Sequence, residues 1–199
     1  MNAVRRHTLS TAALRGLLQV LAVLALVSQA AAAERIVLDF ENVRKPPYPP
    51  GGAGGALYTV IKRPHVIEDG FKLRRVKGRA RGPSFAYWDP PAPGYTGSVA
   101  IQAQLPFNTR TILRPTTPGR IFGLLKLHAT NCCGRRNSTM TIRGVKANGS
   151  VVKRTIRVPA TVELKPFRFS RTWRGLKKVT FNQTDFTQMD DIMLIEEGQ

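Results

Sequence analysis

Apolar and polar residues alternate along much of this chain, with the two-residue period of a β-strand. Ile36, Leu38 and Phe40 fall on one parity, while Asp39 and Glu41 fall on the other. Because successive side chains of a strand point to opposite faces, this alternation predicts a strand with one buried face and one solvated face. No window after residue 34 sustains the apolar stripe of an amphipathic helix.

The same period recurs in a series of short segments that are separated by turn residues. The segments predicted to be strands are Arg35–Glu41, Leu57–Lys62, Gly70–Val76, Ser84–Trp88, Ser98–Gln102, Thr109–Leu113, Arg120–His128, Thr139–Arg143, Val152–Val158, Phe167–Phe169, Trp173–Phe181 and Ile192–Leu194. Within Val152–Val158, Arg154 occupies the apolar parity and is the exception to the pattern. Many short strands with frequent turns and outward charge predict an all-β antiparallel sandwich or barrel.

Glycine and proline mark the connections between the predicted strands. Asn148-Gly149 lies between two of them and is a tight-hairpin signal. Residues 45–55 hold four prolines and four glycines, a composition that excludes regular structure. We interpret this stretch as a long loop after the first strand, because one strand before a domain boundary could not fold alone.

The first 33 residues have the three parts of a secretory signal peptide. Three arginines and no acid precede an apolar run, Leu17–Val27, and small residues then lead to Ala33. A membrane-spanning helix needs about 20 apolar residues, and this run is shorter. We therefore predict a signal peptide over 1–33 and a single domain over 34–199 without a transmembrane segment, secreted or periplasmic.

The charge of the chain narrows the class of partner. Lys and Arg number 31 against 12 Asp and Glu, a net charge of +19, and removal of the three leader arginines leaves +16. A field of this strength attracts polyanions and anionic surfaces. The alternative is that the basic surface only keeps a secreted protein soluble.

Both ends of the chain carry short motifs. The opening segment Ile36–Glu41 has the form I-x-L-D-F-E, and Trp173–Phe181 has the form W-x-x-L-x-x-V-x-F, followed by D-D-I-x-L at Asp190–Leu194. With these motifs the chain resembles the galactose-binding-like jelly-roll modules. Such modules occur among carbohydrate-binding modules and in secreted or surface proteins of bacteria. The resemblance implies an antiparallel jelly-roll β-sandwich in which the first and last strands are neighbours.

The resemblance also implies a structural calcium ion held by acids near those two strands. The candidate ligands are Asp39, Glu41, Asp190 and Asp191. Calcium takes six to eight oxygen ligands, which carboxylates and carbonyls supply. The alternative is that Asp39 and Glu41 are solvated, outward-facing residues and that Asp190 caps a turn.

Basic residues next to aromatic residues form the candidate binding site. The run Lys72–Arg81 has six basic residues in ten and leads into an aromatic segment, which a proline-rich loop follows. Guanidinium groups bind carboxylate, sulfate or phosphate in a fork, and flat rings stack on ligands. The candidate contacts are Lys72, Arg74, Arg79, Arg81, Tyr87, Trp88 and Tyr95.

A second basic cluster lies near the C-terminus. Its members are Arg168, Arg171, Arg174, Lys177 and Lys178. For both clusters the alternative is a solvated strand face, on which lysines also protect an edge strand from aggregation. The adjacent Cys132 and Cys133 leave open a strained ring, intermolecular bridges or free thiols, and they lack the spacing of a zinc site.

Catalytic signatures are scarce in this sequence. The motifs G-x-S-x-G and H-E-x-x-H and the P-loop do not occur, and His65 and His128 are far apart in the chain. Carboxylate pairs can be drawn from Glu68, Asp69, Asp89 and Glu163, but their spacing singles out none of them. No enzyme activity is therefore predicted.

These observations predict a non-catalytic binding module for extracellular carbohydrate, with acidic polysaccharide as the expected ligand class. One alternative is a basic structural or adhesive protein of the cell envelope that meets anionic surfaces without a defined pocket. Another is a secreted enzyme that degrades acidic polysaccharide. Nucleic acid is a weaker partner because export removes most such targets. No cofactor is expected beyond the calcium ion, and the sequence leaves the oligomeric state open.

Overall fold

Thirteen antiparallel strands build the described part of the chain, as the two-residue period predicts. The computed structural model describes residues 33–41, 58–61, 65–77, 85–88, 99–103, 109–131, 136–184 and 187–198. The predicted leader except for Ala33, the stretch 45–55 and the two cysteines lie outside these residues. No helix within the described ranges is long and apolar enough to cross a membrane.

Six strands form one layer in the order β3-β4-β7-β12-β9-β10. Their bounds are β3 His65–Glu68, β4 Phe71–Lys77, β7 Thr109–Pro115, β9 Ser138–Lys146, β10 Val151–Val158 and β12 Leu176–Gln183. Leu73 lies opposite Leu113, which in turn lies opposite Val179. These three side chains are buried, so the register places the apolar side chains of the three strands together on the inner side of the layer.

The other seven strands form a second layer around β13. Their bounds are β1 Arg35–Leu38, β2 Tyr58–Ile61, β5 Phe85–Trp88, β6 Ile101–Ala103, β8 Ile121–Thr130, β11 Lys165–Arg168 and β13 Gln188–Glu197. One edge of β13 pairs with β8, and its other edge pairs with β1 and β6. The first and last strands are therefore neighbours, as the resemblance implies.

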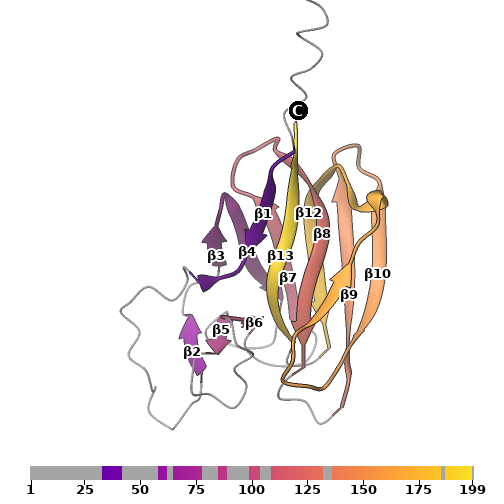
Figure 1. Cartoon of the computed structure of the whole chain (residues 1–199). Helices are drawn as coiled ribbons and strands as arrows, with labels where there is room; N and C mark the ends of the chain where they lie inside the picture. Colours follow the sequence, from indigo (N-terminus) through magenta and orange to yellow (C-terminus); the bar gives the residue numbers. More distant parts are fainter. Residues whose placement is uncertain are drawn as a thin grey trace, which may run out of the picture. The chain divides into compact units, whose positions relative to one another are not determined.

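The two layers form a sandwich, with β13 and β8 in front of β7 and β12 in Figure 1. Ladder pairing joins the layers at a single residue pair, where Leu176 of β12 lies opposite Phe122 of β8. Large apolar side chains fill the space between the layers. The fully buried phenylalanines are Phe40, Phe71, Phe85, Phe122 and Phe181. Phe71 and Phe122 come from different layers and pack edge to face with ring centroids 5.2 Å apart, a favoured aromatic geometry.

The predicted strand Trp173–Phe181 is wrong in its first residues. Arg171–Trp173 form a short 3₁₀ helix, η2, and the strand β12 begins only at Leu176. Gly175 between them has φ +67°, a left-handed conformation that glycine adopts without steric cost and that interrupts an extended chain. The side chain of Trp173 belongs to the core, because it is 4% exposed.

Gly144 lets the strand β9 pass close to this tryptophan. A Cβ atom at Gly144 would lie 2.8 Å from Leu176 Cδ2 and 3.3 Å from Trp173 Cζ3. Real Cβ atoms do not approach other atoms so closely, so the packing of η2 on the sandwich requires a residue without a side chain here.

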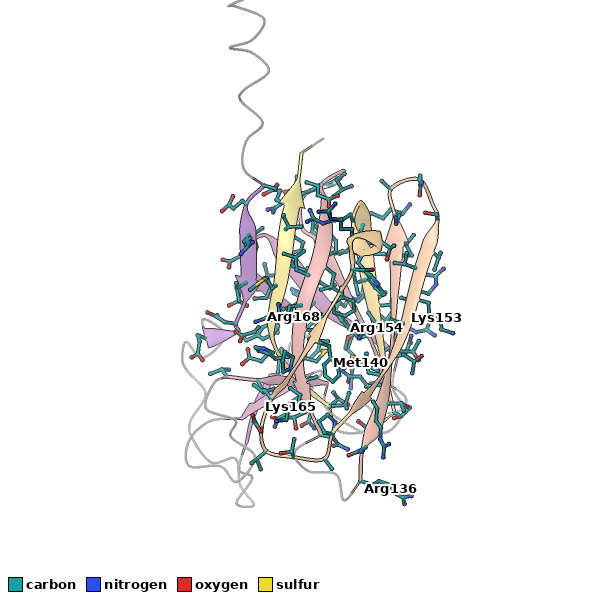
Figure 2. All side chains as sticks on the ribbon, turned by 45° about the vertical axis from the view of Figure 1, so that its right-hand side comes forward. Arg136, Met140, Lys153, Arg154, Lys165 and Arg168 are labelled. Atoms are coloured by element: carbon teal, nitrogen blue, oxygen red, sulfur yellow. The ribbon has the colours of Figure 1, made fainter. Side chains whose placement is uncertain are left out.

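The exception at Arg154 has a physical reason. Its guanidinium lies over the ring of Phe169, 5.3 Å from the centroid, and it donates a hydrogen bond to the backbone oxygen of Arg168. Figure 2 shows Lys153 on the outer side of β10 and Arg154 on the side of β11. Arg154 therefore covers the rim of the core with its stem and a cation–π contact.

The hairpin predicted at Asn148-Gly149 is confirmed. This turn joins β9 to β10, and Asn148 Oδ1 accepts a hydrogen bond from the Ser150 backbone N–H at 3.0 Å.

The strand β3 was not predicted from the sequence. Its inward positions are Val66 and Glu68, both buried. A carboxyl group on the inward parity conceals the strand from a search for alternating apolar residues.

Candidate functional site

A basic hollow of about 700 Å³ opens where several strands of the six-stranded layer begin or end. It is lined by Ile67, Lys72, Arg114, Pro115, Thr116, Thr117, Pro118, Gly119, Arg120, Ile121, Ala147 and Lys177. We name this hollow the basic groove. Among the described residues its wall contains four cations and no carboxylate, a composition that favours anions.

The turn between β7 and β8 forms one wall of the basic groove. Thr116 anchors this turn through two hydrogen bonds to the Gly70 carbonyl oxygen, one from its backbone N–H at 2.8 Å and one from its hydroxyl at 2.9 Å. These bonds tie the β7–β8 turn to the β3–β4 turn. The threonine and proline residues of the wall are thus held by the fold, as a preorganised site requires.

Arg120 in the same turn is committed to structure. Its Nε and Nη2 donate to the two carboxylate oxygens of Glu196 on β13, both at 2.7 Å. The guanidinium also lies over the Phe71 ring, 5.0 Å from the centroid. This bidentate ion pair neutralises the arginine, so Arg120 contributes shape more than charge to the basic groove.

The other three cations of the wall carry uncompensated charge. Lys72 lies directly opposite Arg114 in the β4–β7 register, and Lys177 is exposed at the start of β12. Within the described ranges, none of the three forms an ion pair with a carboxylate. Three unpaired cations around a hollow with threonine hydroxyls and an apolar isoleucine can bind a ligand that has both carboxylate or sulfate groups and apolar ring faces.

Glu68 is the buried acid nearest to the basic groove, but it faces the other way. Its neighbour Ile67 lines the basic groove, whereas Glu68 is 7% exposed and points into the sandwich. Burial raises the pKa of Glu68 from 4.5 to about 7. The Phe40 N–H donates a hydrogen bond to Glu68 Oε2 at 3.0 Å and opposes this rise, whereas the nearby carboxylates of Asp39 and Asp69 add to it. A pKa near 7 is typical of a general acid, yet this carboxyl does not reach the basic groove.

The four predicted calcium ligands lie at the end of β1 and in β13, and each is occupied by a local contact. Asp39 Oδ1 accepts the Glu41 N–H, and Glu41 Oε1 accepts the Val99 N–H. Asp190 Oδ1 accepts the Asp191 N–H, and Asp191 Oδ2 pairs with His128 Nδ1 at 2.8 Å.

These carboxylates do not converge on one point. Among the residues that the structure places, no three His, Cys, Asp or Glu side chains lie together as metal ligands. Calcium takes six to eight oxygen ligands, and backbone carbonyls can supply part of them. The structural calcium stays a prediction from the resemblance.

The structure separates the predicted sugar contacts into two groups. Lys72 and Arg74 lie on the outer side of β4, and Lys72 lines the basic groove. Tyr87 and Trp88 lie in β5 opposite Thr59 and Tyr58, and only their backbone is described. Arg79, Arg81 and Tyr95 lie outside the described residues. The roles of all seven residues stay predictions.

Sequence reasoning missed Arg114 and the threonines of the β7–β8 turn as site residues. Arg114 stands alone among apolar and polar neighbours, so no local cluster marks it. Only its cross-strand position opposite Lys72 makes it part of the site. Lys177 belonged to the second basic cluster, which the structure divides between several elements.

No model of a known protein family matches the chain, and no curated protein sequence matches it. Among solved structures, the chain is similar to TmCBM61, a carbohydrate-binding module in complex with β-1,4-galactotriose. The TM-score is 0.41 at 11% identity, over 65% of this chain and 90% of that chain.

Two further solved structures have comparable coverage of this chain. The family 32 carbohydrate-binding module of NanJ from C. perfringens, in complex with galactose, has a TM-score of 0.39 at 8% identity, over 70% of this chain and 99% of that chain. The enzymatically active domain of tailspike protein 4 from bacteriophage CBA120 has a TM-score of 0.31 at 13% identity, over 71% of this chain but 20% of that chain. The solved structures that this chain is similar to thus include carbohydrate-binding modules, the class that the sequence resemblance names.

Proposed function

We propose that this chain is a non-catalytic module that binds an acidic carbohydrate outside the cytoplasm. The observation that carries the proposal is the basic groove, a hollow of about 700 Å³ surrounded by Lys72, Arg114 and Lys177. Among the described residues these three form no ion pair with a carboxylate. Export rests on the leader over 1–33, and the galactose-binding-like jelly roll rests on the resemblance of the two chain ends.

The chemistry of the wall favours an acidic sugar over a neutral one. A neutral sugar would leave three like charges facing one another across the hollow, whereas a carboxylate or sulfate group would offset their repulsion. Arg114 offers a planar fork for a carboxylate, and the two lysines offer movable ammonium groups. Thr116 and Thr117 add hydroxyls for sugar oxygens, and Ile67, which is 55% exposed, offers an apolar surface for the ring carbons.

The aromatic segment remains part of the proposal as a separate contact. Tyr87 and Trp88 at the end of β5, and Tyr95 in the proline-rich segment that follows in the sequence, would stack on sugar rings. Arg74, Arg79 and Arg81 would supply further cations beside them. Arg74 does not line the basic groove, and the side chains of the other five lie outside the described part of the structure.

A binding assay with matched variants tests this function. The protein is titrated with oligogalacturonate, a sulfated oligosaccharide and a neutral galacto-oligosaccharide in about 0.15 M salt, which screens exposed charges beyond about 8 Å. The triple variant Lys72→Ala, Arg114→Ala, Lys177→Ala removes the free cations of the basic groove. The control variant Arg35→Ala, Arg136→Ala, Arg171→Ala removes the same charge from exposed positions elsewhere.

We expect the groove variant to weaken binding of the acidic oligosaccharide about 100-fold and the control variant about twofold at most, because contacts in a hollow exceed exposed charges in strength. Equal losses in both variants, with binding that salt removes completely, would instead favour the basic envelope protein without a pocket. Release of an unsaturated or shortened sugar during the titration would favour the enzyme.

A further inference from the structure

The outer side of the six-stranded layer carries a second concentration of unpaired positive charge. The side chains that point inward from this layer are mostly apolar, whereas many of those that point outward are lysine or arginine. The outward cations are Lys72, Arg74, Arg110, Arg114, Arg143, Lys153, Arg157 and Lys178. We name these eight residues and the side chains between them the basic face. In the described part of the chain, none of the eight is paired with a carboxylate.

The strand register aligns the basic face in rows that cross the strands. One row runs Lys153, Arg143, Thr180, Ile112, Arg74 and His65, from β10 to β3. The next row runs Thr155, Thr141, Asn182 and Arg110. Neighbouring strands lie about 4.8 Å apart, so the first row separates Lys153 from Arg74 by about 19 Å.

Side-chain contacts within the second row hold it in place. Arg110 Nε donates to Asn182 Oδ1 at 2.9 Å, and the hydroxyls of Thr141 and Thr155 are 3.1 Å apart. The arginine is thus oriented by a neutral partner and keeps its full charge. Such preorganisation lowers the conformational entropy that a ligand contact must overcome.

The basic face places like charges directly opposite one another. Lys72 lies opposite Arg114, and Lys153 lies opposite Arg143. Directly opposed like charges destabilise a sheet. Protection of edge strands explains charge on β10, an edge of the layer, but β7 and β9 lie inside the layer and have no free edge. The repulsion therefore calls for a partner that offsets it.

We propose that the basic face continues the basic groove as a track for a long anionic polysaccharide, carboxylated or sulfated, which lies across the strands. Lys72 and Arg114 belong to both surfaces, so one chain can pass from the groove toward β10. A ligand must extend about 19 Å to use both ends of the track. The inference deepens the proposed function, because it turns a site for a short acidic sugar into one for a polymer.

The side chains of the track favour a glycan over other polyanions. No phenylalanine, tyrosine or tryptophan occupies an outward position of β4, β7, β9, β10 or β12, and proteins that bind single-stranded nucleic acid stack its bases on aromatic side chains. Threonine and asparagine lie between the cations instead and offer hydrogen bonds to sugar hydroxyls. Peripheral membrane binding draws on buried apolar area. The outward apolar side chains here, Ile67, Val76, Ile112 and Val151, come from four different strands and stand among cations.

Ligand length separates the track from the groove experimentally. The protein is titrated with digalacturonate and with an oligogalacturonate long enough to cover about 19 Å. The track variant Arg143→Gln, Lys153→Gln, Arg157→Gln leaves every residue of the basic groove intact. The control variant Arg35→Gln, Arg136→Gln, Arg171→Gln removes the same charge off the track, and thermal unfolding shows that each variant folds.

We expect the native protein to bind the long ligand about tenfold more tightly than the short one, and the track variant to lose this difference while the control keeps it. The salt dependence of long-ligand binding should also become shallower in the track variant, since fewer counterions are displaced. An unchanged preference for length in the track variant overturns the inference and leaves the groove function standing. Failure of the native protein to bind either ligand overturns the proposed function itself.

Two further probes test the identity of the polymer. A heparin-type oligosaccharide of the same charge separates sulfate from carboxylate recognition. Single-stranded DNA of matched charge and phosphatidylcholine vesicles containing phosphatidylserine test the other polyanions. Binding of either that equals the glycan in affinity and is lost equally in the track variant would overturn the assignment to a polysaccharide.

Discussion

The two layers of the sandwich differ in the balance of basic and acidic residues in their strands. The six strands of the layer that carries the basic face hold thirteen Lys and Arg residues and a single acid, Glu68. The seven strands around β13 hold four of each sign. Net charge alone does not reveal this division, because an even distribution would give the same total.

The acids of β13 pair with basic side chains from other elements. Asp191 pairs with His128, Glu196 with Arg120, and Glu197 with Arg174. Each pair joins β13 to a segment distant in sequence. Among the described residues no carboxylate plays this part on the basic face, and the only acid within the strands of that layer, Glu68, points inward. The second layer thus uses charge to hold the sandwich together, whereas the basic face leaves its charge available to a partner.

The largest effect is expected at Glu68, the one acid of the basic layer. Its pKa is about 7 in the folded protein against 4.5 for an ordinary Glu. Between these values the folded state binds a proton that the unfolded state does not, so stability falls as pH rises from 4.5 to 7 and stays low above 7. Glu68→Gln should therefore raise the free energy of unfolding near pH 8 by up to about 3 kcal/mol.

Urea unfolding of both proteins near pH 4 and near pH 8 checks this prediction. The glutamine oxygen can still accept the Phe40 N–H, so the fold is retained. At the lower pH the two proteins should differ little, since the acid is protonated in the folded state and increasingly in the unfolded state. A stability difference that does not change with pH would show that Glu68 is not the titrating group.

A smaller effect is expected from the ion pair between Arg120 and Glu196. Arg120 is 19% exposed and held at both nitrogens, so Glu196→Gln should lower stability by about 1–2 kcal/mol, as for hydrogen bonds to charged groups. Glu163→Gln is the matched control, because its pair with Lys165 is far more exposed and should contribute under about 0.5 kcal/mol. Equal losses in chemical denaturation would remove the distinction between a structural pair and a surface pair.

The smallest effect, of opposite sign, is expected on the basic face. Lys153→Glu replaces a repulsive pair with Arg143 by an attractive one and should stabilise the protein by about 0.2–1 kcal/mol. The control Arg35→Glu changes the same charge opposite Ile195 and should not stabilise. Thermal unfolding measures both. A stabilised Lys153→Glu variant that binds acidic polysaccharide more weakly would show that the basic face trades stability for binding.

Much of the site could not be predicted because its residues are far apart in the sequence. Lys72 was predicted because it begins a dense basic run, but Arg114 and Lys177 lie 42 and 105 positions further along the chain. Strand register and the turn contacts of Thr116 bring these residues together. The acids at the end of β1 and in β13 were predicted as neighbours, and the two strands do pair.

The amino-acid sequence by itself determined the all-β class, the apolar face of nearly every strand, the hairpin at Asn148-Gly149 and the excess of positive charge. These properties are local or additive, since side-chain alternation, turn chemistry and charge counts need no knowledge of which strands pair. The tertiary structure decided the segregation of that charge, the groove at the strand ends and the inward position of Glu68. Each of these depends on which strand lies beside which and in what register, and that choice is made by burial of the whole core at once.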